Sequence, residues 1–151
     1  MRDIEYPHRW PRPRRRFAQH FLVDKAVARQ IVDLVRPECA ERVLEIGPGR
    51  GALTRLLVGS LERLVVVEVD RDLAALLRQR FDGPGFRLIE GDVLKLDLCR
   101  VAEEENREKL LVVGNLPYNI SAPLLFRLIE QANCVSRAVL MLQREVARRL
   151  V

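Results

Sequence analysis

The sequence is poor in the residues from which metal sites and disulfide frameworks are built. Its 151 residues include three cysteines and two histidines. Cys39, Cys99 and Cys134 are widely spaced, odd in number and form no CxxC pair, so we expect reduced thiols of a cytoplasmic protein and no metal site. His8 and His20 are too few to form a metal cluster.

Long apolar runs are also missing. No stretch approaches the length that spans a bilayer, and the charged N-terminus lacks the apolar core of a secretory signal. We therefore expect no membrane partner. The 48% hydrophobic content is sufficient for one globular domain with a full core.

The charge is modest in total but uneven in distribution. The formal net charge is +5, from 26 basic and 21 acidic residues. Arginines crowd the first 16 residues, whereas glutamates cluster between positions 103 and 108. We predict that residues 1–16 form a basic, flexible arm, with Arg12, Arg14, Arg15 and Arg16 as nucleic-acid-binding residues. A solvated tail without a partner is the alternative.

Residues 45–51, Glu-Ile-Gly-Pro-Gly-Arg-Gly, connect a predicted buried strand over 42–46 to a segment of helical spacing. Glycine in such a turn allows the backbone to approach a ligand, because a side chain would collide with it or forbid the required angles. We predict Gly47 and Gly49 to bind a cofactor. A turn that uses glycine only for its own geometry is the alternative.

Residues 64–70 are typical of the next strand, and Glu68 lies 21 positions after Gly47. An acidic residue near this distance, at the end of the second strand, commonly holds a pair of ribose hydroxyls. Glu68 or Asp70 could instead cap the following helix. We assign the cap to Asp70 and the ribose to Glu68, which predicts a nucleoside-containing cofactor.

The remaining chain alternates predicted helices and strands. Asp24 is expected to cap a first helix, whose apolar face would comprise Val27, Ile31, Leu34 and Val35. Further strands are expected at 86–89, 110–114 and 138–142, with a short acidic helix between 98 and 109 and a helix opening at Ser121-Ala122-Pro123.

This alternation predicts an α/β fold, a parallel sheet flanked by helices, with ligands beyond the carboxyl ends of its strands. Gly47, Glu68, Asp92 and Asn115 all follow predicted strand ends. We therefore expect them on one rim of the sheet.

Residues 115–118, Asn-Leu-Pro-Tyr, suit a flat substrate that carries an amino group. The exocyclic amine of adenine is a poor nucleophile because its lone pair is delocalised into the ring. The Asn115 side-chain oxygen and a backbone carbonyl of Leu116 or Pro117 could bind its two N–H groups and favour the pyramidal nitrogen that attack requires. Tyr118 could stack on the base, which must be unpaired or flipped out. A turn with a core tyrosine is the alternative.

Six ordered motifs carry a resemblance to a known family: QHFLVD, EIGPGRGALT, VVEVD, EGDVLKLD, GNLPYNISAPLLFRLI and MLQREVARRL. From about Arg14 to Val151 the chain resembles the S-adenosylmethionine-dependent rRNA adenine N6-dimethyltransferases. It is more similar to the small-subunit (16S-type), kasugamycin-resistance group than to the macrolide-resistance enzymes that act on large-subunit rRNA. The resemblance implies a Rossmann-like methyltransferase fold, S-adenosylmethionine as cofactor, and the small ribosomal subunit precursor as partner.

The resemblance also implies residue roles. His20 and Leu22 would contact the methionine and ribose portions of the cofactor, although asparagine is also common at the position of His20. Ala18 replaces a frequent glycine. The remaining roles are Gly47 for the methionine moiety, Glu68 for the ribose, Asp92 for the cofactor adenine, Asn115 and Tyr118 for the target adenine, and Asn115 also for the cofactor.

The chain is shorter than the family pattern, which continues with two more strands, a further aromatic-bearing motif and a small helical domain. We expect residues 17–151 to form a partial domain lacking these parts, with impaired methylation. A sheet ended at its fifth strand would expose an apolar edge, so a monomer is expected only if that edge is covered.

Two other functions remain open from the sequence. A nicotinamide-dependent oxidoreductase would share the glycine turn, and Ala52 satisfies its spacing. That reading leaves residues 115–118 unexplained and offers no evident proton donor. A non-catalytic RNA-binding or ribosome-assembly module would explain the arginine-rich arm.

Overall fold

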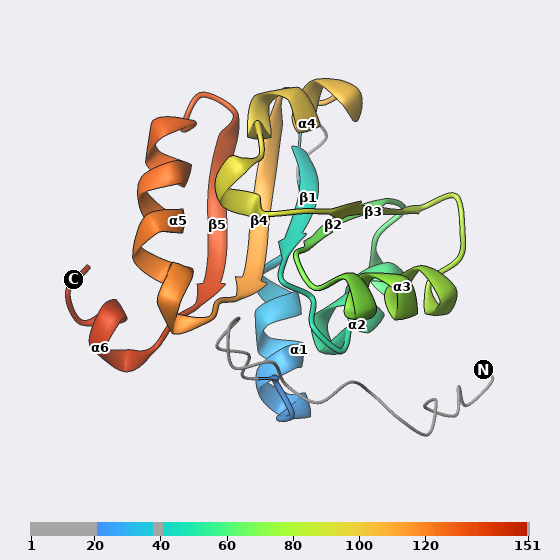
Figure 1. The fold of residues 1–151 in the computed structure, drawn as a ribbon, viewed down its shortest axis with the longest axis horizontal. Coiled ribbons are helices and arrows are strands. Elements are labelled where there is room, and N and C mark those ends of the chain that lie inside the picture. Colours follow the sequence, from blue (N-terminus) through green and yellow to red (C-terminus); the bar gives the residue numbers. More distant parts are fainter. Residues whose placement is uncertain (1–20, 38–40, 151) are drawn as a thin grey trace.

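The computed structural model describes residues 21–37 and 41–150, and within them five strands form one sheet (Figure 1). Every neighbouring pair is parallel, and the strand order is β3-β2-β1-β4-β5. The strands are β1 Glu41–Ile46, β2 Leu64–Glu68, β3 Phe86–Glu90, β4 Lys109–Asn115 and β5 Val135–Met141. The predicted α/β fold with a parallel sheet is confirmed, and the order reverses between β1 and β4, where ligands bind in open sheets of this kind.

Helices cover both faces of the sheet (Figure 1). They are α1 Lys25–Leu34, α2 Ala52–Ser60, α3 Arg71–Arg80, the 3-10 helix η2 Val93–Lys95, α4 Leu98–Glu104, α5 Tyr118–Glu130 and α6 Arg144–Ala147. One buried cluster joins α1 and α2 to β1, β2 and β4. A second cluster joins α4, α5 and η2 to the other face of the same three strands.

The central strands are apolar on both faces because helices cover both. All five residues of β2 are buried, as are the apolar residues from Leu110 to Val113 in β4. Strands buried in this way show continuous apolar runs instead of alternation. This explains why the sequence predicted β1, β2 and β4 nearly to the residue.

The first helix differs from the prediction in one residue of its apolar face. Asp24 caps α1 as expected, its Oδ1 accepting from the backbone N–H groups of Ala26 and Val27. Ile31 and Val35 are buried, but Leu34 is 61% exposed, so its assignment to the core was wrong. At 100° per residue, position 34 falls beside the face on which 31 and 35 lie.

Two later elements begin earlier than predicted. Helix α5 begins at Tyr118, not at Ser121, because Pro117 precedes it with φ −59° and serves as its N-cap residue. Pro123 therefore lies inside the helix and not in its first turn. Strand β5 begins at Val135, not at Ala138. The polar Ser136 hid this start, yet its hydroxyl donates to the carbonyl of Leu110, which suits an exposed edge strand.

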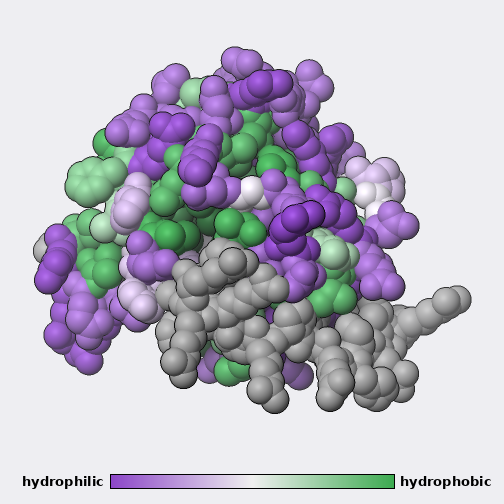
Figure 2. All heavy atoms as spheres, in the orientation of Figure 1, coloured by the Kyte–Doolittle hydropathy of each residue, from purple (hydrophilic) through white to green (hydrophobic). Residues whose placement is uncertain are grey.

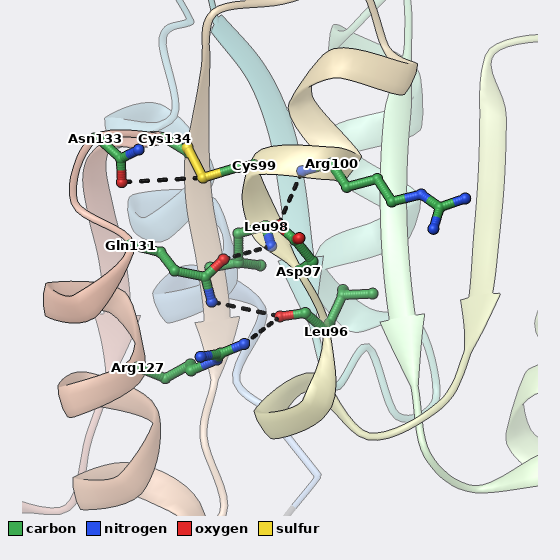
Figure 3. Close-up of a disulfide and its surroundings, with 9 residues drawn as sticks. All are labelled: Leu96, Asp97, Leu98, Cys99, Arg100, Arg127, Gln131, Asn133 and Cys134. Atoms are coloured by element: carbon green, nitrogen blue, oxygen red, sulfur yellow. Dashed lines mark hydrogen bonds between the residues drawn. A yellow bond between two sulfur atoms is a disulfide. The ribbon is translucent and has the colours of Figure 1, made fainter.

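The expectation of three reduced thiols is wrong. Cys99 and Cys134 form a disulfide across 35 positions of sequence, with their Cα atoms 5.0 Å apart (Figure 3). Cys99 lies in α4 and Cys134 lies immediately before β5. Their spacing in the sequence gives no sign of this contact, because it depends on how α4 packs beside the end of α5.

The glutamate-rich segment does not form a uniformly solvated patch. The Glu105 side chain is fully buried and forms ion pairs with Arg42, Arg63 and Arg87. These arginines belong to β1, the residue before β2, and β3. The network therefore joins the end of α4 to the amino-terminal ends of three strands, at the edge of the sheet opposite the predicted ligand rim.

Within residues 21–37 and 41–150, no helix has both the length and the apolar composition needed to cross a membrane. On the face shown in Figure 2, polar and charged side chains cover most of the periphery, and apolar side chains are visible between them near the centre.

Candidate active site

A cavity of about 240 Å³ lies at the carboxyl ends of β1, β2 and β4. Residues from five separate segments line it, starting with Phe21 and Leu22 before α1 and ending with the start of α5. The structure brings together around this cavity the predicted residues Leu22, Gly47, Gly49, Glu68, Asp92, Asn115 and Pro117.

The glycine turn has the backbone angles that its residues imply. Gly47 has φ +62° and Gly49 has φ +56°, both in the left-handed region that disfavours side chains. A Cβ on Gly49 would also lie 2.9 Å from the Phe21 ring. The N–H of Gly47 donates to the carbonyl of Val67 at 3.0 Å, which ties the turn to β2.

Glu68 anchors this turn to the end of the second strand. Its Oε2 accepts from the N–H of Gly49 at 3.1 Å, and its Oε1 accepts from the N–H of Asp70 at 3.0 Å. Burial raises the pKa of Glu68, and these backbone hydrogen bonds oppose the rise. Asp70 accepts from the N–H groups of Asp72 and Leu73, so its predicted role as the cap of α3 is confirmed.

Glu45 is a cavity residue that we did not single out from the sequence. Only 1% of it is exposed, it lines the cavity, and its Oε2 has no hydrogen-bond partner among the described residues. The pKa of Glu45 is raised to about 8, mainly because the side chain is buried; a hydrogen bond with Thr54 opposes the rise and the nearby charge of Glu68 adds to it. The available signal was a glutamate that interrupts the apolar residues Val43, Leu44 and Ile46.

Asp92 is positioned by the turn that follows β3. Its Oδ1 accepts from the N–H of Leu94 at 2.9 Å and caps η2. Val93 and Leu94 also line the cavity, so this cap fixes one wall of it.

Two of the four residues in the predicted substrate segment, residues 115–118, line the cavity, and the other two do not. Asn115 and Pro117 line the cavity. The Leu116 side chain is 5% exposed in the core, and its N–H donates to the carbonyl of Met141 at 3.1 Å. Tyr118 begins α5, is 53% exposed and is not among the lining residues.

Asn119 and Ile120 line the cavity as well, and we did not select them from the sequence. The signal was their position in the first turn of a helix that begins directly at the substrate segment. That signal was missed because the helix was expected to begin at Ser121.

Some predicted residues lie outside the described residues: His20, Arg12, Arg14, Arg15 and Arg16. Across the described ranges, no group of three or more histidine, cysteine, aspartate or glutamate side chains is placed to hold a metal ion.

The family model for ribosomal RNA adenine dimethylase matches residues 11–151. The chain belongs to this family.

Curated relatives agree with the family match. A ribosomal RNA small subunit methyltransferase A from Leptothrix cholodnii is 51% identical over 138 residues, which cover 91% of this chain and 50% of the relative. Its counterpart from Acidovorax ebreus is 50% identical over 139 residues, covering 92% of this chain and 54% of the relative. The chain therefore spans about half the length of the curated relatives it matches.

Solved structures resemble the fold. The 23S rRNA methyltransferase ErmE has a TM-score of 0.71 and 28% identity, covering 85% of this chain and 50% of that one. A dimethyladenosine transferase from Plasmodium falciparum also has a TM-score of 0.71 and 28% identity, covering 87% of this chain and 46% of that one. The predicted Rossmann-like methyltransferase fold is confirmed.

Proposed function

We propose that this chain serves the S-adenosylmethionine-dependent dimethylation of adenine N6 in small-subunit rRNA during ribosome assembly in the cytoplasm. The observation that carries the proposal is one cavity that joins the glycine turn and Glu68 to Asn115 and Pro117. Its partner would be a precursor of the small ribosomal subunit, as the names of the relatives suggest.

The charges around the cavity favour S-adenosylmethionine over a nicotinamide dinucleotide. Two carboxylates line it, those of Glu68 and Asp92, and one cationic side chain, that of Arg50, is among the lining residues described. Glu45 also lines it but, with a pKa of about 8, is mostly protonated at pH 7. S-adenosylmethionine carries a positive sulfonium and an ammonium group, which buried carboxylates attract. The diphosphate of a dinucleotide would meet repulsion instead.

The residues present fit the parts of this cofactor. Glu68 retains lone pairs for the ribose hydroxyls after accepting from Gly49 and Asp70. Asp92 would accept from the adenine amine, Gly47 would lie against the methionine moiety, and Leu22, with His20, would cover the ribose and methionine portions. When bound, the cofactor supplies an electrophilic methyl group.

The protein would act on the target adenine through position and hydrogen bonding. The Asn115 carboxamide oxygen and the carbonyl of Leu116 or Pro117 would accept from the N6 amine and stabilise its pyramidal form. Tyr118 would stack on the base from outside the cavity. We assign no general base, so orientation of the amine toward the methyl group accounts for the rate.

Calorimetric titration tests the cofactor first. We expect S-adenosylmethionine to bind with a stoichiometry near one and NAD to give no heat of binding. Binding of NAD without S-adenosylmethionine would contradict the proposal in favour of the oxidoreductase.

A second experiment tests the substrate segment. Methyl transfer to unmodified small-subunit particles should be weak in the unsubstituted chain, as expected of a partial domain, and lost in Asn115→Ala. Particle binding that is unaffected by Asn115→Ala, with neither S-adenosylmethionine binding nor methyl transfer by the unsubstituted chain, would instead favour an assembly module.

A further inference from the structure

The disulfide between Cys99 and Cys134 (Figure 3) joins two segments that both lead to the candidate cavity. The first segment begins at η2, where Val93 and Leu94 line the cavity, and reaches Cys99 in the first turn of α4. The second segment is α5, whose first turn lines the cavity and which ends shortly before Cys134. The disulfide therefore connects two elements that both contribute to the lining of one cavity.

Hydrogen bonds beside the disulfide join the same two segments (Figure 3). The N–H of Leu98 donates to Gln131 Oε1 at 2.7 Å. The carbonyl of Leu96 accepts from Gln131 Nε2 at 3.4 Å and from Arg127 Nη2 at 3.2 Å. Leu96 directly follows η2, and η2 itself contacts α5. A movement of α4 away from the end of α5 would therefore displace η2 as well.

The 3-10 helix η2 is a single turn whose order depends on its surroundings. Its Lys95 N–H donates to the Asp92 carbonyl at 3.0 Å, and the Leu96 N–H donates to the Val93 carbonyl at 3.2 Å. The Leu94 N–H donates to Asp92 Oδ1 at 2.9 Å. One turn with hydrogen bonds of this kind is only weakly stable by itself. The part of the cavity lining that η2 supplies is therefore kept in place by the packing of η2 and α4 against α5.

A small thiol can reach this disulfide from one side. Cys99 is half-buried and only 8% of Cys134 is exposed, so a thiolate attacks the sulfur of Cys99 and Cys134 leaves as a thiolate. A second thiolate of the reductant then breaks the mixed disulfide and releases Cys99. The reductant becomes a disulfide, and its two electrons and two thiol protons pass to the cysteines. In the cytoplasm, where the proposed function would take place, disulfides are usually transient or redox-sensing.

We infer that Cys99 and Cys134 form a redox switch that sets the affinity of the candidate cavity for its cofactor. In the oxidised state the disulfide holds α4 against the end of α5, so η2 and its part of the lining are ordered before the ligand binds. In the dithiol state this order has to be established during binding, which lowers the affinity. The inference rests on the proposed function for the identity of the ligand, S-adenosylmethionine.

Hydrogen exchange followed by mass spectrometry tests the structural part of the switch without any ligand. The 151-residue chain is compared with and without dithiothreitol in peptides that cover residues 92–98. These peptides contain the hydrogen-bonded N–H groups of Leu94, Lys95 and Leu98. We expect them to exchange about tenfold faster after reduction.

Two cysteine variants assign the effect to this pair. Cys99→Ser with Cys134→Ser should exchange like the reduced chain in both conditions, because no disulfide can form between these positions. Cys39→Ser should respond to reductant like the unsubstituted chain. A response that is lost in Cys39→Ser would overturn the inference.

A further control separates local loosening from a general loss of stability. Leu64 is fully buried at the start of β2, at the end of the strand away from the cavity, so Leu64→Ala destabilises the fold without altering the disulfide. In this oxidised variant, exchange at residues 92–98 relative to α3 should equal that of the unsubstituted chain. An increase on reduction that is spread evenly over the chain would overturn the inference, because the disulfide would then only stabilise the fold.

Calorimetric titration with S-adenosylmethionine tests the functional part. We expect the oxidised chain to bind about five- to tenfold more tightly than the reduced chain. Because linkage is reciprocal, S-adenosylmethionine should shift the equilibrium between dithiol and disulfide in a glutathione buffer toward the disulfide by the same factor. Equal affinities in the two redox states would overturn the switch.

The two measurements distinguish failure of this inference from failure of the proposed function. Absence of S-adenosylmethionine binding in both redox states would refute the proposed cofactor, whereas a local change in exchange at residues 92–98 would still establish redox control of the cavity lining. Equal binding in both states without a local change in exchange would refute the switch and leave the proposed function intact.

Discussion

Glu68 contributes to the candidate site in two ways at the scale of a single residue. Its two oxygens hold the N–H groups of Gly49 and Asp70, so it fixes the glycine turn against the start of α3. It also lines the cavity in which we place the cofactor ribose. Both contributions require a carboxylate that accepts several hydrogen bonds at once.

We predict that Glu68→Gln lowers the affinity for S-adenosylmethionine by about 10- to 100-fold. The amide replaces one acceptor by a donor, which would face a backbone N–H or a ribose hydroxyl unfavourably. Calorimetric titration measures the effect, and Glu62→Gln, at an exposed position before β2, is the control. Equal affinities of Glu68→Gln and the unsubstituted chain would exclude Glu68 from the cofactor site.

Glu45 makes stability depend on pH. Its folded pKa of about 8 lies above the unfolded value near ~4.3, so the folded state holds a proton that the unfolded state has lost between these pH values. The contribution of Glu45 to the free energy of unfolding is therefore fully present below pH ~4.3 and is lost as the pH rises toward 8.

We predict that Glu45→Gln, a neutral substitute, gains stability relative to the unsubstituted chain as the pH rises. Between pH ~5.5 and ~7.5 the difference in the free energy of unfolding should grow by about 2–3 kcal/mol at most. Urea denaturation at the two pH values provides the measurement, and both histidines are common to the two proteins. A difference independent of pH would show that Glu45 titrates normally.

At the scale of elements, the disulfide lies in a cluster that joins α4 to the end of α5 (Figure 3). The N–H of Leu98 donates to Gln131 Oε1 at 2.7 Å, and Arg127 Nη2 donates to the Leu96 carbonyl at 3.2 Å. This segment follows η2, whose residues Val93 and Leu94 line the candidate cavity. The cluster therefore ties the segment that follows this wall of the cavity to the end of α5.

Reduction of the disulfide should lower the free energy of unfolding by about 4 kcal/mol, on the chain-entropy relation for a loop closed over 35 positions. Thermal unfolding with and without dithiothreitol measures the change. Cys99→Ser with Cys134→Ser should reproduce the reduced protein without reductant, whereas Cys39→Ser should respond to reductant like the unsubstituted chain. A melting temperature insensitive to reductant would contradict the prediction.

The Glu105 network joins elements at the other edge of the sheet. Its Oε2 lies 2.7 Å from Arg63 Nε, and its Oε1 lies 2.9 Å from Arg87 Nη1. The carboxylate has no solvent exposure. Removal of its charge would leave three arginines without this buried negative partner, which destabilises the folded state.

We therefore predict that Glu105→Gln lowers the free energy of unfolding by about 3 kcal/mol. Glu104→Gln is the matched control, because Glu104 also pairs with Arg87 but faces solvent, where its effect should be small. Denaturant titration of both variants compares them. Similar losses of unfolding free energy in the two variants would show that the buried position of Glu105 adds nothing to the strength of its ion pairs.

At the scale of the whole molecule, one side of the sheet remains open. Within the described part of the chain, β5 pairs only with β4. The neighbouring helix α5 exposes Phe126 by 68% and Ile129 by 70%, and apolar side chains are visible at that side of the surface (Figure 2). An unpaired edge beside exposed apolar side chains favours association.

We predict that the isolated chain self-associates as its concentration rises, and that Phe126→Lys with Ile129→Lys shifts it toward the monomer. Sedimentation velocity at several concentrations reports the distribution. Val58→Lys, on α2, should leave it unchanged. A chain that is monomeric at every concentration would show that this surface does not drive association.

The sequence by itself determined the order of the elements and placed Leu22, Gly47, Gly49, Glu68, Asp92 and Asn115 at the carboxyl edge of the sheet, where they line one cavity. Apolar runs mark β1, β2 and β4 because these strands are buried on both faces, and Gly47, Gly49 and Asp70 have backbone roles that few other residues fill. Such features depend on near neighbours in the chain, and sequence patterns record near neighbours directly.

Tertiary structure alone decided the contacts between distant segments. It placed Glu105 among three arginines, joined Cys99 to Cys134 and buried Glu45 beside Glu68. It also excluded Leu34 from the core and left Tyr118 outside the cavity. Each outcome depends on how helices and strands pack, and the burial, charge pairing and pKa of a side chain depend on neighbours that its own stretch of sequence does not specify.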